Sequence, residues 1–129
     1  MLHTGITHRI EQEVRPEMSA ARVGSGLADV LATPAMIALA ERTCYESVVP
    51  YLEEGLGTVG TLVNIKHLSA TPIGMSVWCE SELVEVDRRR LLFAVKVYDR
   101  CGLIGEGWHE RFVVDTAQFE AKTAAKFSQ

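Results

Sequence analysis

A long helical segment near the middle of the chain constrains the fold more than any other feature. Good helix formers run from Ala35 to Val49, preceded by Thr33 and Pro34 and followed by Pro50. A threonine hydroxyl can cap free N–H groups at a helix start, and a proline there lacks only an N–H that would be unpaired anyway. Because proline also stops a helix, the segment predicts one long helix that begins after Thr33 and ends at Pro50.

One face of this helix is apolar except for a single carboxylate. Apolar residues recur at helical spacing along that face, at Ile37, Ala40, Cys44 and Val48. Glu41 falls in the same stripe. Burial of a carboxylate costs free energy unless it is paired, and it raises the pKa toward the range useful for a general base. Two interpretations stay open: Glu41 is catalytic, or it is exposed or paired structurally.

Five segments of the chain are expected to be extended. They lie at residues 6–14, 58–69, 75–86, 90–98 and 104–115. Short connections between the last four favour antiparallel neighbours, and the long helix is the only large element able to cover one face of their sheet. The pattern therefore predicts a single α+β domain over residues 1–129. Surplus apolar surface on the strands at 75–86 and 90–98 indicates a homodimer.

Charge and cysteine content exclude several classes of protein. A net charge of −4 and a pI near 5.5 argue against a nucleic-acid partner. No apolar run approaches the roughly 20 residues that a membrane span needs, and no signal peptide is visible. The three cysteines have no metal-ligand spacing, so we expect free thiols in a reducing cytoplasm, with no metal and no cofactor.

Three stretches of the sequence carry a family resemblance. They are ATPAMIALAERTCYESVVPYLEEGLGTVGT, then VNIKHLSATPIG, then GEGWHERFVV with FEAK, and together they span residues 32–122. These stretches resemble the hotdog-fold acyl-CoA thioesterases, most closely the branch that contains the fluoroacetyl-CoA thioesterase. The resemblance implies a five-stranded antiparallel sheet wrapped around the long helix, a dimer that continues the sheet, and hydrolysis of a short acyl-CoA.

The resemblance also implies a set of site residues. Thr33, Glu41 and His67 match the catalytic threonine, glutamate and histidine of that branch, and Gly60 and Arg111 match residues near the acyl group. Glu41 would act as nucleophile or general base, two roles that sequence alone leaves open. His67 would be a general acid or base, and Thr33 would position the carboxylate or a water molecule.

The segment before the helix bears on substrate selectivity and not on the hydrolysis reaction itself. The fluoroacetate-selective member of the branch carries phenylalanines in a lid there, whereas this chain reads GSGLADVLA, with Leu27 and Val30 and no aromatic residue. We therefore expect Leu27 and Val30 to contact substrate if residues 17–32 form a lid. The identity of the acyl group is left open.

Each of these residues also has a structural interpretation. A threonine before a helical proline can serve only as a cap, and a histidine on a strand face is often a satisfied core residue. Gly60 suits either a β-bulge or an oxyanion hole, and Arg111 either a structural ion pair or neutralisation of developing charge.

Two other functions remain open: a hotdog hydratase or dehydratase of enoyl thioesters, and a non-catalytic module that binds acyl-CoA or a small ligand. Release of free thiol from acyl-CoA distinguishes hydrolysis from both.

Overall fold

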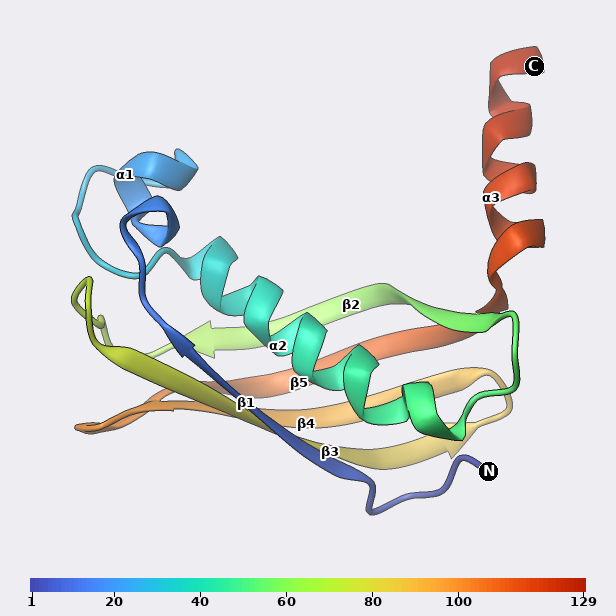
Figure 1. Cartoon of the computed structure of the whole chain (residues 1–129), viewed down its shortest axis with the longest axis horizontal. Coiled ribbons are helices and arrows are strands. Elements are labelled where there is room, and N and C mark those ends of the chain that lie inside the picture. Colours follow the sequence, from blue (N-terminus) through green and yellow to red (C-terminus); the bar gives the residue numbers. More distant parts are fainter.

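The computed structural model describes all 129 residues and holds one five-stranded antiparallel sheet with a long helix across one face (Figure 1). The strands are β1 (Thr7–Glu13), β2 (Leu56–His67), β3 (Ser76–Asp87), β4 (Arg90–Asp99) and β5 (Gly102–Asp115). Their order across the sheet is β1-β3-β4-β5-β2, which leaves β1 and β2 as its edges. The predicted α+β layout is confirmed, and strand bounds differ from the expected ones by one or two residues at most ends.

The covering helix is α2 (Thr33–Val48). Its buried residues are Met36, Leu39, Ala40, Thr43, Cys44, Ser47 and Val48. They face fully buried apolar side chains of the sheet, among them Val77, Leu83, Leu91, Phe93 and Val97. Each large apolar side chain buried in this way contributes roughly 1.5–3 kcal/mol. The chain continues past α2 as a 3₁₀ turn, η2 (Val49–Tyr51), because Pro50 lies in the first turn, where no N–H is needed.

A bulge in β2 decides which of its side chains face α2. The pairing of β2 with β5 shifts between Gly60 and Leu62, so Thr61 is an extra residue. Gly60 pairs with the buried Arg111, whereas Val59 pairs with a residue of the open face. Val59 and His67 therefore lie on opposite faces of β2, because a bulge moves the side chains before it to the other face. The bulge expected at Gly60 is confirmed.

Short helical elements flank this core. Before α2 lie η1 (Pro16–Met18) and α1 (Ala20–Val23), and after β5 lie α3 (Thr116–Ala124) and η3 (Ala125–Ser128). Figure 1 shows α3 standing away from the sheet, and it is exposed along its whole length. No helix is both long enough and apolar enough to cross a membrane.

Candidate active site

The N-terminus of α2 meets the last residue of β2. Thr33 Oγ1 lies 2.7 Å from His67 Nδ1, within hydrogen-bonding distance. The helix cap position is Ala32, and no side chain caps the helix there. The capping role expected for Thr33 is therefore wrong: Thr33 is the first residue of the helix, and its hydroxyl contacts the histidine. We call these two residues the Thr33–His67 pair.

A small cavity lies beside this pair. Its volume is about 320 Å³, and its lining includes Thr33, His67, Val30 and Leu68. Burial lowers the pKa of His67 below its ordinary value near 6.5, so the imidazole is neutral at pH 7. Its Nε2 atom is buried and has no hydrogen-bond partner. A buried ring nitrogen without a partner is unfavourable, so this atom is well suited to bond a group that enters the cavity.

Glu41 lies on α2, next to Gly60 of β2 and at the edge of the buried face of the helix. Its side chain is 40% exposed, and its Oε2 atom is 3.8 Å from Arg111 Nη1. The sequence placed Glu41 in an apolar stripe and left open whether it is catalytic, exposed or structurally paired. In the structure the helix turns Glu41 toward the free edge of the sheet, where it is partly exposed and paired with Arg111.

Gly60 leaves room for three functional groups. A Cβ atom at this position would lie 3.0 Å from Glu41 Oε2, 3.2 Å from His109 Cε1 and 3.3 Å from Arg111 Nη1. These separations are shorter than most contacts of real Cβ atoms. Three side chains thus approach the backbone closely at the bulge, and any side chain at Gly60 would displace at least one of the three groups.

Arg111 is held from several sides. Its Nε donates to Thr58 Oγ1 at 2.8 Å and its Nη2 donates to the Thr58 carbonyl oxygen at 2.9 Å. Its Nη1 lies 3.1 Å from His109 Nε2, and its guanidinium stacks on the ring of Tyr45. Burial lowers the pKa of Arg111, which is only 8% exposed. Glu41, Thr58, Gly60, His109 and Arg111 are called the carboxylate cluster below.

The sequence did not identify two members of this cluster, Thr58 and His109, and only His109 has a titratable side chain. His109 is fully buried, and its Nδ1 lies 2.8 Å from the carbonyl oxygen of Leu62. The only signal in the sequence was its position two residues before Arg111, on the same face of β5.

The carboxylate cluster and the Thr33–His67 pair do not touch within one chain. Thr33 and Glu41 are eight residues apart on one helix, which separates them by roughly 12 Å along its axis. Glu41 makes its ion pair with Arg111, and Thr33 makes its hydrogen bond with His67. The structure therefore brings the predicted residues to the same face of the sheet, in two separate groups.

The two predicted lid residues have different surroundings. Val30 lines the cavity beside His67, and it forms an isolated bridge with Pro72. Leu27 is 97% exposed and lines no part of that cavity.

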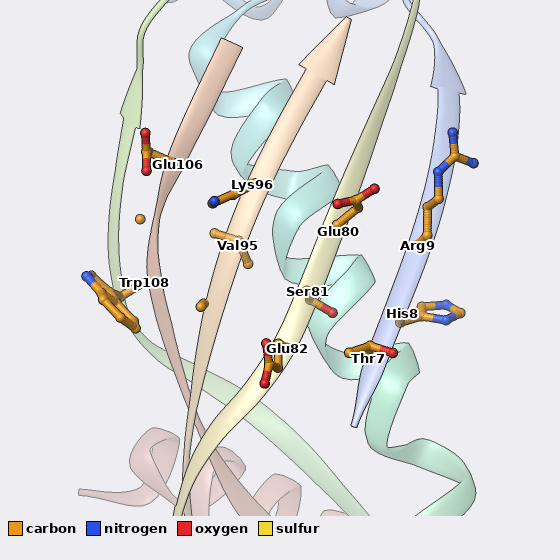
Figure 2. A pocket seen from close by; sticks show the side chains of 12 residues that line it. Thr7, His8, Arg9, Glu80, Ser81, Glu82, Val95, Lys96, Glu106 and Trp108 are labelled. Carbon is orange, nitrogen blue, oxygen red and sulfur yellow. The ribbon is translucent and has the colours of Figure 1, made fainter. Parts of the chain in front are cut away.

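A larger hollow, of about 580 Å³, lies on the open face of the sheet (Figure 2). It holds none of the predicted site residues. One cross-strand row there alternates in charge, in the order Arg9, Glu80, Lys96, Glu106 and then Lys66 of β2. Neighbouring strands thus place opposite charges side by side, which stabilises a sheet without any ligand. No group of three or more potential ligand side chains is placed to hold a metal ion.

Comparisons with known proteins agree with this fold. Residues 14–117 match a family model described as the fluoroacetyl-CoA-specific thioesterase. The chain is 41% identical over 98 residues to the fluoroacetyl-CoA thioesterase of Streptantibioticus cattleyicolor, which is 76% of this chain and 70% of that protein. A solved structure of the fluoroacetyl-CoA thioesterase FlK superposes with a TM-score of 0.93 at 32% identity, over 98% of both chains. A thioesterase superfamily member from Thermus thermophilus gives a TM-score of 0.91 at 27% identity, over 99% of this chain and 95% of that one.

Proposed function

Since the chain belongs to the family of fluoroacetyl-CoA-specific thioesterases and hydrolyses acyl-CoA thioesters on a hotdog fold, we propose that Glu41, His67 and Thr33 carry out this reaction. The observation that carries the assignment is the hydrogen bond between Thr33 and His67. A threonine at a helix start ordinarily caps its own helix, and here it orients an imidazole instead.

Glu41 acts on the thioester carbonyl carbon. As a general base it takes a proton from water, the resulting hydroxide adds to that carbon, and the carbon–sulfur bond then breaks. The CoA thiolate takes up a proton, so the products are a free acid and CoA. As a nucleophile, Glu41 would form an acyl-enzyme anhydride that water then hydrolyses. Either route begins with an ionised carboxylate beside Arg111. The positive charge of Arg111 holds this carboxylate in place and stabilises the negative charge that builds up on the acyl oxygen.

The active enzyme is a homodimer that pairs through β2. This strand is an unpaired edge 12 residues long, and residues 60–64 are exposed. Leu62 and Val63 are 47% and 43% exposed, which favours covering this edge with another strand. The fully exposed helix α3, with Phe119 on its surface, begins beside the same strand.

Dimer symmetry gives the two groups of the site a way to meet. A two-fold axis between Val63 and Asn64, within the exposed stretch, pairs β2 with its own copy in antiparallel fashion. His67 of the partner subunit then lies beside Gly60, and hence close to Glu41. Each active site would combine the carboxylate cluster of one subunit with the Thr33–His67 pair of the other.

Complementation tests this arrangement. Glu41→Gln and His67→Asn are each expected to abolish most turnover as homodimers. Mixing them with subunit exchange should restore roughly a quarter of the wild-type rate, because half of the dimers are mixed and each mixed dimer has one intact site. No restoration, in mixtures shown by tagged subunits to contain mixed dimers, would place all three residues of a site in one subunit.

Light scattering provides the matching measurement of assembly. The wild-type protein should have twice the chain mass of 14.2 kDa. A proline at Val63, in the centre of the proposed pairing, should give a monomer without turnover.

A thiol-release screen defines the reaction and the acyl group. Short, branched and aromatic acyl-CoAs are incubated with the enzyme, and free CoA is measured with a thiol reagent. Release of CoA is expected for short acyl groups. A hydratase would change the absorbance of an enoyl-CoA without releasing thiol, and a binding module would be stabilised by acyl-CoA without any turnover.

The lid and the cellular setting belong to the same proposal. We place the acyl group in the cavity that Val30 lines, with Leu27 closing over it when substrate binds. The lack of lid aromatics gives no basis for fluoroacetyl selectivity. Residues 1–129 would form one domain, and three free cysteines favour the reducing cytoplasm.

A further inference from the structure

We propose that His109 is a positioning residue for this reaction, which fixes the guanidinium of Arg111 in its place beside Glu41. The inference rests on the proposed roles of Glu41 and Arg111. His109 is fully buried, so we expect it to act through Arg111 and not on the substrate itself.

The hydrogen bonds of Arg111 show what His109 contributes. Thr58 accepts from Nε and Nη2, which anchors one edge of the guanidinium fork. Rotation about that edge would still let Nη1 move. His109 Nε2 accepts from Nη1 at 3.1 Å and supplies the missing constraint. The same Nη1 atom is the one that lies 3.8 Å from Glu41 Oε2.

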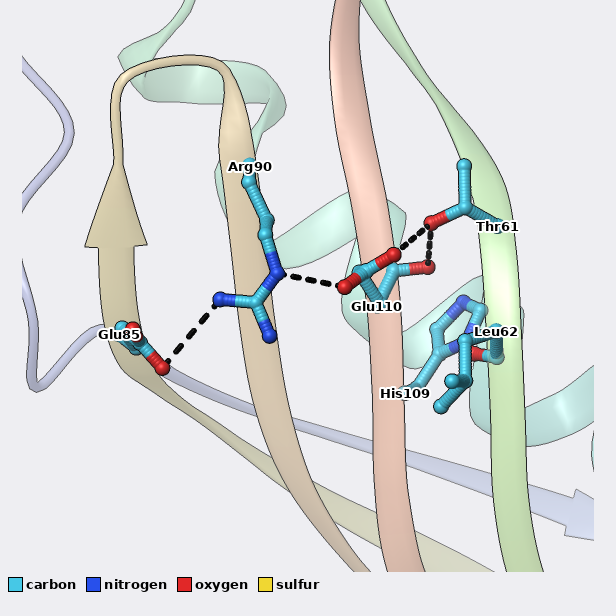
Figure 3. Close-up of polar contacts among 6 residues, drawn as sticks. All are labelled: Thr61, Leu62, Glu85, Arg90, His109 and Glu110. Carbon is cyan, nitrogen blue, oxygen red and sulfur yellow. Dashed lines mark hydrogen bonds and ion pairs between the residues drawn. The ribbon is translucent and has the colours of Figure 1, made fainter.

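The tautomer of His109 follows from its other partner. The Leu62 carbonyl oxygen, 2.8 Å from Nδ1, can only accept, so Nδ1 carries the hydrogen. Nε2 then has a free lone pair, which accepts from the guanidinium. Figure 3 shows the His109 ring beside Leu62 of β2, whereas its neighbour Glu110 reaches Thr61 and Arg90 on the open face. The carbonyl oxygen of Leu62, in the edge strand β2, thus selects the His109 tautomer that can accept a hydrogen bond from Arg111.

The surroundings of His109 keep the ring neutral. Burial is the main cause that lowers its pKa, and the charge of Arg111 acts in the same direction. The hydrogen bond to Leu62 and the carboxylates of Glu41 and Glu110 oppose this shift without reversing it. Phe93, the aromatic ring stacked at 6.4 Å, carries no charge. Protonation would remove the acceptor and place two cations in contact, so Arg111 would lose this constraint.

Two substitutions at His109 test its hydrogen bond to Arg111 separately from its hydrogen bond to Leu62. In His109→Gln, the amide oxygen can reach the position of Nε2 and accept from Arg111. In His109→Asn, the shorter amide can replace Nδ1 and donate to Leu62, but nothing reaches Arg111. We expect His109→Asn to lower kcat by roughly ten- to a hundredfold, the usual effect of misplacing a group by about 1 Å, with little change in KM. His109→Gln should stay within about threefold of wild type.

A double-mutant cycle shows whether His109 acts through Arg111. Adding His109→Asn to Arg111→Gln should cause no further loss of kcat, because the group that His109 positions is already absent. The inference is overturned if the two losses multiply, or if the Gln and Asn variants have equal turnover per folded dimer. If Arg111→Gln and Glu41→Gln both keep full activity, the proposed function fails instead, which is a distinct result.

The pH profile provides a readout that a purely structural residue would not change. Wild-type kcat should fall steeply on the acid side, because His109 must be neutral. His109→Gln cannot be protonated there, so its acid limb should be less steep. Profiles that superimpose would contradict the inference, and this measurement remains available if His109→Asn does not fold.

Discussion

The two groups of the proposed site differ in how they are held. The carboxylate cluster is a charged assembly in which a nearly buried arginine is bound by Thr58, His109 and Glu41. The Thr33–His67 pair is neutral, and a single hydrogen bond joins its two residues beside a cavity.

The physical reason for this difference is the cost of burying charge. A buried guanidinium needs a hydrogen-bond acceptor for each N–H group, and loss of one acceptor costs free energy because a buried donor is left unsatisfied. A neutral imidazole with a single hydrogen-bond partner costs far less free energy to bury than a charged guanidinium. The carboxylate cluster should therefore be sensitive to any change in its supporting residues, whereas the Thr33–His67 pair should be sensitive mainly to loss of its own two side chains.

Removal of the carboxylate is the largest expected effect. Glu41→Gln keeps the size of the side chain and removes its charge and basicity, so kcat should fall by roughly 10²–10⁴-fold in the thiol-release assay, with the dimer intact. The control is Glu46→Gln, which removes the charge that pairs with Arg42 on the same helix and should leave kcat unchanged. Near-wild-type turnover of a folded Glu41→Gln enzyme would contradict the assignment.

Changes in the neutral pair come next. His67→Asn can keep a polar atom near Thr33 but removes Nε2, and kcat should fall by about a hundredfold. Thr33→Val leaves the imidazole in place without its hydroxyl partner, and we expect a loss of about tenfold. Thr33→Ser is the matched control and should keep most activity. Equal losses in the valine and serine variants would show that the hydroxyl has no role.

A methyl group at Gly60 tests how tightly the carboxylate cluster is packed. Gly60→Ala places Cβ against Glu41 and Arg111, so we expect about a tenfold loss of kcat with a modest loss of stability. The control is Gly26→Ala, whose Cβ would meet only the side chain of Ala20 at 3.6 Å. An unchanged kcat in Gly60→Ala would mean that the cluster can relax without consequence.

The smallest expected effect is on the pH dependence of stability. The folded pKa values of His67 and His109 lie below the unfolded value near 6.5. The unfolded chain therefore binds more protons as the pH falls below about 6.5, and the free energy of unfolding decreases through each folded pKa. Above about pH 6.5 the full contribution is present. Thermal melts of His109→Gln between about pH 5 and 7 should show a flatter slope than wild type, on the order of a few degrees in Tm. An unchanged slope would show that His109 does not contribute.

The fold could be predicted from the sequence because its signals are local. The proline-bounded helix and the alternating strands depend on residues close together in the chain, and one long helix offers the only cover for the sheet. The bulge was also visible, since a glycine within a strand suggested it. The face to which Val59 points could not be predicted, because it depends on register across two strands.

The site was harder to predict, because its partners lie far apart in the sequence. Thr33 looked like a helix cap, and only tertiary structure shows that His67, 34 residues later, takes its hydroxyl instead. Glu41 fell in the apolar stripe, but its exposure depends on how α2 lies over the free edge of the sheet. His109 gave almost no signal, since a histidine inside a strand has the same appearance whether it packs passively or bonds an arginine.

By itself, the sequence determined the elements of this protein and the identity of its proposed site residues, because helix and strand periodicity and residue chemistry are properties of the local chain. Tertiary structure alone decided how these side chains are divided between the carboxylate cluster and the Thr33–His67 pair. It joined Thr33 to His67, joined Glu41 to Arg111 and added His109 between Leu62 and Arg111. The physical reason is that hydrogen bonds and ion pairs act over a few ångströms, a distance that only the packing of α2 on β2 and β5 establishes.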